Sequence, residues 1–341
     1  MMDQRSPHAS GLEDVVAAHT RLSDVDGEAG RLVIAGHPVE SLAGKATFEE
    51  AVFLLRRGRL PAADELAEVR RHLGEARARA RFVPVSLADP MDALRARMAG
   101  TEGDDVYGIL GAMAVAAAGS SGPPDPAASH AADYLRLATG KTPSPEQVAA
   151  LDAYLVAVID HGMNASTFTA RVVASTASDM TSAVVAAIGA LKGKLHGGAP
   201  GPVLDMLDAI GDAASARDWV AAALARGERI MGMGHRIYRT RDPRALVLER
   251  AVGRMASTAR LELARAVERE AETQLAAKYP DRPLKCNVEF YTTILLEAVG
   301  LPRALFTPTF AVSRAAGWCA HVEEQRATGK LIRPKSVYVG P

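Results

Sequence analysis

Three histidines lie in sequence contexts that suit chemistry on a bound ligand. They occur in the segments DHGMNASTF (His161), KLHGGAP (His196) and GMGHR (His235). Two of them are flanked by glycines, which let the backbone approach a ligand or adopt a tight turn. A single histidine is more often a surface residue or a hydrogen-bonded core residue, so none of the three predicts a catalytic site by itself.

Arginines accompany these histidines. They are Arg236, Arg239, Arg241 and Arg244 behind His235, and Arg314 and Arg333 near the C-terminus. The planar guanidinium binds carboxylates and phosphates through two parallel hydrogen bonds. Histidines in glycine-rich loops together with clustered arginines indicate a small polycarboxylate and a phosphorylated co-substrate. A solvated helix start would explain the charges of the cluster but not the Gly-Met-Gly-His before it.

Helices must position these side chains, because Ala, Leu, Arg and Glu dominate the chain and aromatic residues are only 5% of it. Thr47 with Glu50 predicts a capping box, and Ser144-Pro145 predicts a helix that runs to about Asp160. Apolar spacing predicts further helices over or around 64–78, 90–99, 204–210, 247–255, 261–275, 287–299 and 309–324.

Two segments depart from the helical pattern. A turn over residues 23–28 and a short strand over 31–34 predict a small hairpin near the N-terminus. The segment GSSGPPDP at 119–126 predicts a surface loop, since glycine and proline interrupt regular structure.

Length and composition restrict the class of protein. A chain of 341 residues favours about two domains. Lys and Arg number 40 and Asp and Glu number 40, so charge alone suggests neither nucleic-acid nor membrane binding. The two cysteines lack paired spacing, which argues against a disulfide framework and a structural zinc site. No HxxxH or HxH pair occurs, so we expect no metal site.

The chain also lacks targeting features. Its first residues show no basic segment followed by an apolar one, so we expect no secretory signal. The longest weakly polar runs, at 109–119 and 183–191, are too short to span a bilayer. We therefore expect a cytoplasmic protein.

The quoted histidine and arginine segments resemble the citrate synthase family. K-L-H-G-G resembles the family's histidine loop, G-M-G-H-R resembles its second active-site histidine, and N-V-E-F resembles the segment of its catalytic carboxylate. The resemblance extends from about Gly11 to Pro341 in the family's order. The matching segments are 23–27, 164–168, 194–198, 232–244, 287–290 and 333–341.

This resemblance implies an all-α fold with two domains. A large helical domain would contain residues 1–196 and 301–341, and a smaller helical domain would contain residues 197–300. The active site would lie in the cleft between them. No cofactor is implied, because acetyl-CoA is itself a substrate of the family.

The implied reaction joins the methyl carbon of acetyl-CoA to oxaloacetate and then hydrolyses the thioester, releasing citrate and CoA. Removing a methyl proton requires a carboxylate base and a hydrogen-bond donor at the carbonyl oxygen, where negative charge develops. By resemblance, Glu289 is the base, His196 is that donor, and His235 polarises the ketone of oxaloacetate.

The resemblance also implies the binding residues. His161, Arg244 and Arg314 would hold the carboxylates of oxaloacetate, and Arg239 matches a position associated with the phosphates of CoA. Arg333 matches an arginine that the neighbouring subunit supplies in this family. The expected assembly is therefore a homodimer.

Position 289 departs from the family, whose base is usually aspartate. Glu289 is one methylene longer, and a misplacement of about 1 Å can cost about a hundredfold in rate. The backbone must adjust, or the activity must be lower or altered. Two alternatives stay open: a 2-methylcitrate synthase that uses propionyl-CoA, since one methylene discriminates by only about 1–3 kcal/mol, and a catalytically weak paralogue that binds CoA or citrate.

Overall fold

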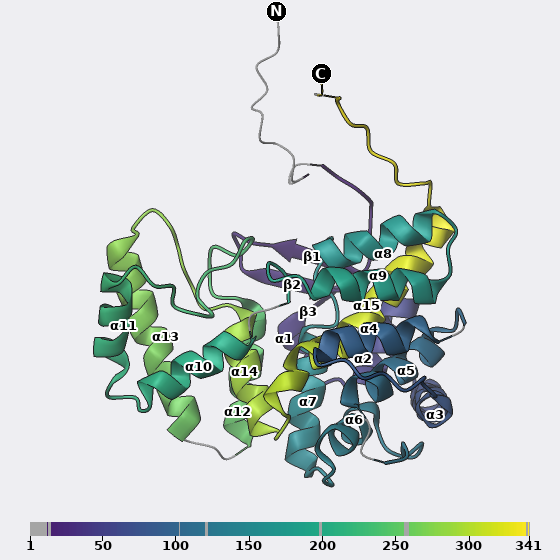
Figure 1. The fold of residues 1–341 in the computed structure, drawn as a ribbon, viewed down its shortest axis with the longest axis horizontal. Coiled ribbons are helices and arrows are strands. Elements are labelled where there is room, and N and C mark those ends of the chain that lie inside the picture. The colour runs from purple at the N-terminus through teal and green to yellow at the C-terminus, as the bar shows by residue number, and fades with distance from the viewer. Residues whose placement is uncertain are drawn as a thin grey trace, which may run out of the picture.

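The computed structural model describes residue 12 and residues 15–101, 103–119, 122–197, 200–255, 259–338 and 340. Helices form most of this part of the chain, and a small antiparallel sheet lies near its N-terminal end (Figure 1). The predicted all-α fold class is confirmed.

The helices follow one another through the chain, and the longest segment between two of them, residues 226–242, carries His235. Their bounds are α1 (Val39–Leu42), α2 (Phe48–Arg57), α3 (Ala63–Arg79), α4 (Pro90–Ala99), α5 (Val106–Ala118), α6 (His130–Thr139), α7 (Pro145–Ala157), α8 (Ala165–Ser175), α9 (Met180–Leu191), α10 (Pro200–Ile210), α11 (Ala216–Ala225), α12 (Pro243–Arg254), α13 (Ala259–Lys278), α14 (Val288–Ala298), the 3-10 helix η1 (Arg303–Leu305) and α15 (Phe306–Thr328). Each predicted helix is present at about its predicted place.

Local sequence signals start several of these helices. The predicted capping box opens α2: the Thr47 hydroxyl accepts from the backbone N–H of Glu50, and the Glu50 carboxylate accepts from the backbone N–H of Thr47 at 2.7 Å. At α12 and α14 the side chains of Asp242 and Asn287 accept from a backbone N–H of the first turn, without the reciprocal contact of a capping box. Because a capping side chain satisfies an otherwise unpaired N–H, these residues set where each helix begins.

The N-terminal hairpin forms, but its turn lies later than predicted. Residues Ser23–Asp26 form strand β1 rather than a turn, and they pair antiparallel with β2 (Arg31–Ile34). Strand β3 (His37–Pro38) completes the sheet in the order β1-β2-β3. The turn falls at the end of β1, where Gly30 has a φ of +63° that glycine adopts at little cost.

Two further differences concern the helices. Helix α7 ends at Ala157, before the predicted end near Asp160, so that His161 lies on the loop that follows it. The predicted helices do not include α5, α6, α8, α9 and α11. Helix α5 is buried on nearly all sides, and an evenly apolar helix shows none of the periodicity on which the prediction depends.

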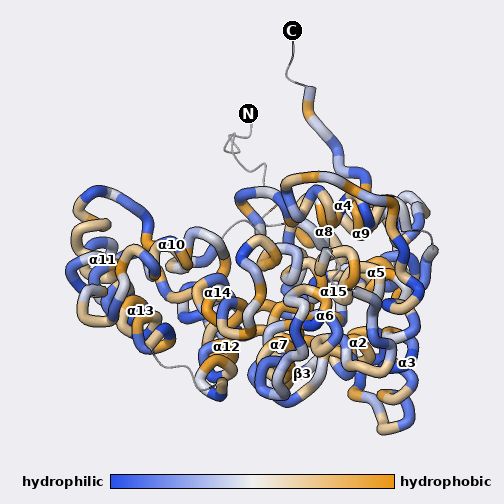
Figure 2. Tube along the Cα trace, turned by 60° about the horizontal axis from the view of Figure 1, so that its bottom comes forward, coloured by the Kyte–Doolittle hydropathy of each residue, from blue (hydrophilic) through white to orange (hydrophobic). Residues whose placement is uncertain are grey.

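Helix α15 lies at the centre of the larger group of helices. It packs against α2, α5, α7, α8 and α9, and Trp318 near its middle is fully buried. Figure 2 shows apolar colour along α15 and its neighbours and polar colour on many outer turns. This packing holds the α15 side chains, Arg314 among them, in fixed positions.

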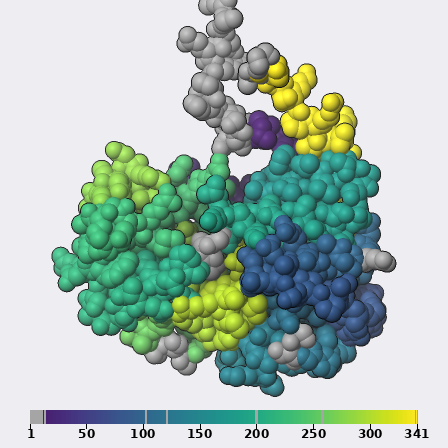
Figure 3. Space-filling view, in the orientation of Figure 1, coloured from purple at the N-terminus to yellow at the C-terminus, as the bar shows by residue number. Residues whose placement is uncertain are grey.

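A second group of helices, α10, α11 and α13, gathers on the side away from α3 and α5 (Figure 1). Helices α12 and α14 pack against each other, and both contact α7 of the larger group. The space-filling surface is hollowed between the two groups (Figure 3). The domain limits at 197 and 300 stay a prediction, but α7, α12 and α14 meet where the predicted site residues lie.

Candidate active site

The loop before α12 carries His235 on a strained, glycine-dependent turn. Gly232 and Gly234 have φ values of +77° and +85°. A Cβ on Gly232 would lie 2.7 Å from the Phe290 ring, and one on Gly234 would lie 2.8 Å from Leu284. Both positions therefore require glycine for conformation and for space.

Backbone contacts set the tautomer of His235. Its Nδ1 accepts hydrogen bonds from the backbone N–H groups of Ile237 at 3.0 Å and Tyr238 at 3.1 Å. A ring nitrogen that accepts carries no proton, so the proton of the neutral ring lies on Nε2. His235 therefore presents a hydrogen-bond donor at Nε2, as polarising a ketone requires.

His161 lies against the same loop. Its ring is 5.7 Å from that of His235, between centroids, and its Nε2 is 3.0 Å from the hydroxyl of Tyr238. The loop of His161 is held in turn by the N-terminal hairpin: the Ser23 hydroxyl donates to Asp160 at 2.6 Å and accepts from the Gly162 N–H at 2.7 Å. Residues far apart in the sequence thus meet at one place.

The buried Asp242 carboxylate holds the Arg244 side chain in place. The carboxylate accepts two hydrogen bonds from the guanidinium, at 3.0 Å from Nε and 2.7 Å from Nη2. The same carboxylate caps α12 and accepts the Val288 N–H at 3.2 Å, at the start of α14. One buried side chain therefore fixes Arg244 relative to the helix start that carries Glu289.

Asn287 joins that helix start to the His235 loop. Its Oδ1 accepts the Glu289 N–H at 3.0 Å, and its Nδ2 donates to the carbonyl of Gly234 at 2.8 Å. Glu289 itself is partly exposed as a residue, but its Oε2 is buried and has no hydrogen-bond partner among the described residues. The carboxylate is thus positioned by the backbone while one of its oxygens stays unpaired.

His196 follows α9 and is held from the larger group of helices. Its Nε2 lies 2.8 Å from the Ser166 hydroxyl, and that hydroxyl accepts a hydrogen bond from Trp318 Nε1 at 3.1 Å. Ser166 has one proton to donate, and Asn164 Oδ1 lies 2.8 Å away as a second acceptor. When Ser166 donates to Nε2, the ring carries its proton on Nδ1 and offers it to a ligand.

Arg314 is a buried cation whose main favourable charge, among the described residues, is that of the buried Asp160. It is 1% exposed, and its Nε donates to the carbonyl of Val158 at 2.8 Å. In the described part of the chain it forms no ion pair with a carboxylate, whereas the buried Arg244 is paired with Asp242. A desolvated guanidinium that is not paired with a carboxylate attracts an anionic ligand, so Arg314 is able to receive a carboxylate.

The electrostatics make the histidines neutral donors. Burial, and then the charge of Arg314, lowers the pKa of His196 to about 4. Burial, and then the charge of Arg244, lowers the pKa of His235 to about 4. Burial also lowers the pKa of His161, with smaller effects of both arginines. The three rings are therefore uncharged at neutral pH and donate as imidazoles.

The carboxyl of Glu289 is shifted in the opposite sense. Burial raises its pKa to about 7, Arg244 and Arg314 oppose this rise, and Asp242 adds to it. A base whose pKa lies near the working pH combines availability with proton affinity. The environment therefore suits Glu289 to proton abstraction near neutral pH.

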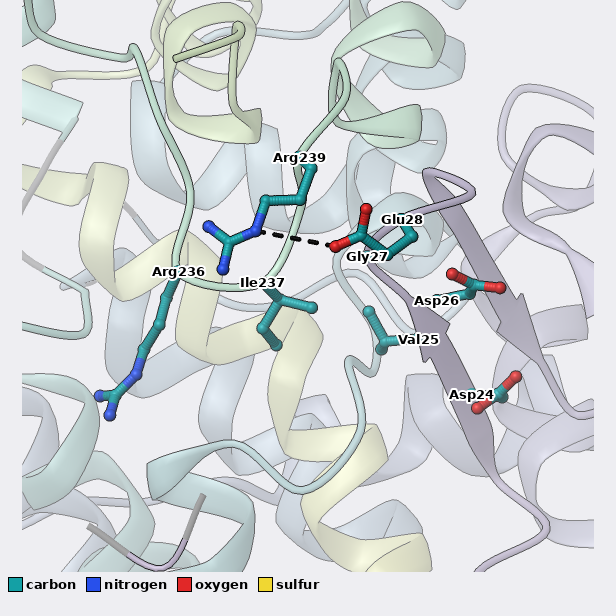
Figure 4. A pocket seen from close by; sticks show the side chains of 8 residues that line it. All are labelled: Asp24, Val25, Asp26, Gly27, Glu28, Arg236, Ile237 and Arg239. Carbon is teal, nitrogen blue, oxygen red and sulfur yellow. Dashed lines mark ion pairs between the residues drawn. The ribbon is translucent and has the colours of Figure 1, made fainter. Parts of the chain in front are cut away.

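Two predicted residues lie apart from this cluster. Arg239 lies beside the hairpin turn, where its backbone N–H donates to Gly27 and its side chain is 3.9 Å from the Glu28 carboxylate. Figure 4 shows it in a surface pocket lined by Asp24, Val25, Asp26, Gly27, Glu28, Arg236, Ile237 and Arg239. Arg333 is exposed on the segment after α15, which leaves the body of the molecule (Figure 1).

The structure thus brings six of the eight predicted residues into one neighbourhood. They are His161, His196, His235, Arg244, Glu289 and Arg314. The sequence reading assigned no role to Ser166, Tyr238 and Asp242, although each lies inside a segment quoted for the resemblance. Ser166 and Tyr238 contact Trp318 and His161, which lie far along the chain, so spacing offered no signal for them. Asp242 pairs with Arg244 two residues on, but its contact with the start of α14 is also distant in sequence.

The described residues contain no group of three or more His, Cys, Asp or Glu side chains that could hold a metal ion. Within the same residues no helix has the length and apolar character needed to cross a membrane. Cys286 and Cys319 are both free and buried.

Comparison with known proteins gives consistent results. The family model for the citrate synthase C-terminal domain matches residues 11–335. Two mycobacterial proteins named citrate synthase 2, from Mycobacterium bovis and Mycobacterium tuberculosis, are each 50% identical to this chain over 199 residues. That segment is 58% of this chain and 53% of theirs. The match therefore spans about half the length of those relatives.

Other relatives match over nearly the whole chain. A citrate synthase of Haloferax volcanii is 37% identical over 97% of this chain and 95% of its own. A 2-methylcitrate synthase of Mycobacterium tuberculosis is 36% identical over 99% of this chain and 92% of its own.

Solved structures share the fold. The citrate synthase of Thermotoga maritima has a TM-score of 0.84 and 34% identity over 97% of this chain and 96% of its own. That of Thermoplasma acidophilum, solved with carboxymethyl coenzyme A and oxaloacetate, has a TM-score of 0.83 and 29% identity over 97% of this chain and 96% of its own. With its fold, its motifs and the family match in agreement, this chain belongs to the citrate synthase family.

Proposed function

We propose that this protein condenses acetyl-CoA with oxaloacetate and hydrolyses the product to citrate and CoA. One observation supports this most directly: a carboxylate with an elevated pKa lies near a buried arginine that forms no ion pair among the described residues and near histidines that are neutral at pH 7. A dicarboxylate substrate supplies the missing negative charge, and a thioester methyl supplies the proton for the base.

The proposed steps assign one task to each group. Arg244, Arg314 and His161 bind the oxaloacetate carboxylates, and His235 Nε2–H donates to its ketone oxygen. Glu289 removes a methyl proton of acetyl-CoA while His196 donates to the thioester oxygen, where negative charge develops. The resulting carbon nucleophile attacks the polarised ketone, and water then cleaves the thioester.

The ligands of the Thermoplasma enzyme support this choice of substrates, since that protein was solved with oxaloacetate and a CoA derivative. No metal or cofactor takes part in the proposed steps, so activity should survive treatment with EDTA. Arg239, on the exposed loop beyond His235, is proposed to bind phosphates of CoA after leaving Glu28. A cytoplasmic location belongs to the same proposal.

The direct test measures CoA release from the purified protein with oxaloacetate and either acetyl-CoA or propionyl-CoA. Rapid release with acetyl-CoA and formation of citrate support the proposal. A clear preference for propionyl-CoA moves the assignment to 2-methylcitrate synthase, which the similarity to that mycobacterial enzyme supports as the second candidate. No release with either thioester favours a binding paralogue.

We further propose a homodimer in which Arg333 completes the site of the neighbouring subunit. The segment that carries it is exposed, and Leu331, Val337 and Tyr338 on it are 58%, 87% and 80% exposed. Apolar side chains on an extended segment outside the body suit burial against a second copy.

Mixed dimers test this arrangement. Arg333→Ala and Glu289→Gln subunits, each nearly inactive alone, are co-expressed with different affinity tags. If Arg333 acts across the interface, a mixed dimer has one intact site, and random assembly recovers about a quarter of wild-type activity. If Arg333 acts within its own subunit, no site is intact and no activity returns.

A further inference from the structure

The hydroxyl of Tyr154 is a buried polar group that the structure leaves unpaired. Tyr154 lies on α7 and is 0% exposed. Its oxygen has no hydrogen-bond partner among the described residues. An unpaired buried hydroxyl costs folding free energy, so its presence calls for a physical reason.

The surroundings of Tyr154 point to the candidate active site. Burial raises the pKa of its hydroxyl, and the charge of Glu289 on α14 is the largest further cause. Tyr134 on α6 acts in the same direction, while Arg314 on α15 and Arg244 on α12 oppose it. Helix α7 packs against all four of these helices. The hydroxyl therefore lies within electrostatic range of the base and of both buried arginines.

Glu289 carries a buried acceptor, Oε2, that lacks a donor among the described residues. The charged groups that act on it are Arg244 and Arg314, which favour the ionised form, and Asp242, which disfavours it. Neither arginine donates to the Glu289 carboxylate: Arg244 donates to Asp242, and Arg314 donates to a backbone carbonyl.

One donor without an acceptor and one acceptor without a donor thus occupy the same neighbourhood. Tyr134, the other buried tyrosine nearby, offers no alternative donor, because its hydroxyl already shares a hydrogen bond of 2.7 Å with Thr309. A glutamate has one more rotatable bond than an aspartate, so its carboxylate covers a wider range of positions and gains more from a hydrogen bond that orients it.

We propose that Tyr154 is a positioning residue for Glu289: in the enzyme with oxaloacetate bound, its hydroxyl donates a hydrogen bond to Oε2 and holds the carboxylate in its catalytic orientation. This inference rests on the proposed function, in which Glu289 is the base. No covalent step involves Tyr154, and its proton stays on the phenol oxygen. The contact explains why an otherwise costly hydroxyl lies at this point of α7.

The test is Tyr154→Phe, which removes only the hydroxyl. A donor to the carboxylate stabilises its ionised form and lowers its pKa, so the variant should have a higher pKa for Glu289 in the substrate complex. The acid limb of the plot of kcat against pH then lies roughly one pH unit higher in the variant. At pH values well below that limb, the kcat of the variant is about tenfold lower than that of wild type.

The kcat/KM profile separates this role from a structural one. When oxaloacetate is the varied substrate, kcat/KM reports the free enzyme, in which the hydrogen bond is absent, so its acid limb should be the same in Tyr154→Phe and wild type. Because kcat falls below its limb while kcat/KM keeps its pH dependence, the ratio of the KM for oxaloacetate in the variant to that in wild type should fall about tenfold from high to low pH. Tyr134→Phe is the matched control, since it removes a buried hydroxyl of the same kind that already has a partner in Thr309; neither of its acid limbs should move.

Two results would overturn the inference. An unchanged kcat profile in Tyr154→Phe shows that the hydroxyl does not act on Glu289. A raised KM for oxaloacetate with an unchanged profile shows that it binds substrate instead.

A spectroscopic measurement keeps this inference distinct from the proposed function. The Glu289 carboxyl carbon is followed by 13C NMR during a pH titration with oxaloacetate present, and Glu289→Gln identifies its signal. A higher pKa in Tyr154→Phe than in wild type supports the contact even if the wild type releases no CoA, in which case only the proposed function fails. Equal pKa values refute the contact whatever the activity.

Discussion

Replacement of Glu289 by glutamine should abolish most activity and at the same time stabilise the unliganded protein. The wild-type carboxyl has its pKa raised from 4.5 to about 7, chiefly by burial. Glutamine keeps the shape of the side chain but is never charged. The variant therefore removes both the base and the cost of ionising a group with a buried, unpaired oxygen.

The sign of the stability effect follows from proton binding. Because the folded-state pKa is higher than that of the unfolded chain, the folded protein binds more protons between about pH 4.5 and 7, and its stability falls as the pH rises through that window. The difference of about 2.5 pKa units corresponds to about 3.5 kcal/mol as an upper limit, at about 1.4 kcal/mol for each unit. Because the side chain is partly exposed, we expect about 1–2 kcal/mol.

The assay compares urea denaturation of wild type and Glu289→Gln at pH 5 and pH 8, without substrates. The variant should gain about 1–2 kcal/mol relative to wild type at pH 8 and much less at pH 5. In the CoA-release assay at pH 8, kcat should fall by roughly 100- to 10,000-fold, as expected for loss of a general base. A stability difference that is equal at both pH values, or near-normal turnover by the variant, would refute the reasoning.

Three further substitutions test other contacts. Asp242→Asn removes the charge that holds a buried arginine and should lower stability by about 3 kcal/mol and raise KM for oxaloacetate, as thermal melts and kinetics would show; a KM equal to wild type argues against this role. Ser166→Ala leaves the active-site histidine ring without its hydroxyl partner and should lower kcat about tenfold with little change in KM; loss of binding alone contradicts this. Gly30→Ala places a Cβ 2.2 Å from the Thr240 hydroxyl oxygen and should lower the free energy of unfolding by about 2 kcal/mol more than Gly36→Ala, where φ is also positive but no atom lies within 4 Å; equal losses would mean that backbone strain alone matters.

Much of the site could be predicted from the sequence because its residues lie in short, ordered segments. His196, His235 and Glu289 were found there, and the structure places each of them near a buried arginine. Their catalytic roles remain proposals. The helix starts were also predictable, since a capping box or a proline at the first helical position acts over a few residues.

Other features had no local signal. Tyr154 reads as one more residue on an apolar helix, and only the packing of α7 against α12, α14 and α15 brings its hydroxyl near a carboxylate. Helix α5 was not predicted because a helix that is buried on nearly all sides shows no apolar periodicity. The hairpin turn lies later in the sequence than predicted, because its position depends on the pairing between β1 and β2 and not on the turn-forming residues alone.

The sequence by itself determined the helical class, several helix starts and the candidate chemical groups, since propensity, capping and motif spacing are properties of neighbouring residues. Only the tertiary structure decided which of those groups meet, which rings are neutral, and that Arg314 is buried with no ion pair among the described residues. The physical reason is that protonation and ion pairing depend on the distance between charges and on their exclusion from water. Both are set by contacts between residues that are distant in the chain.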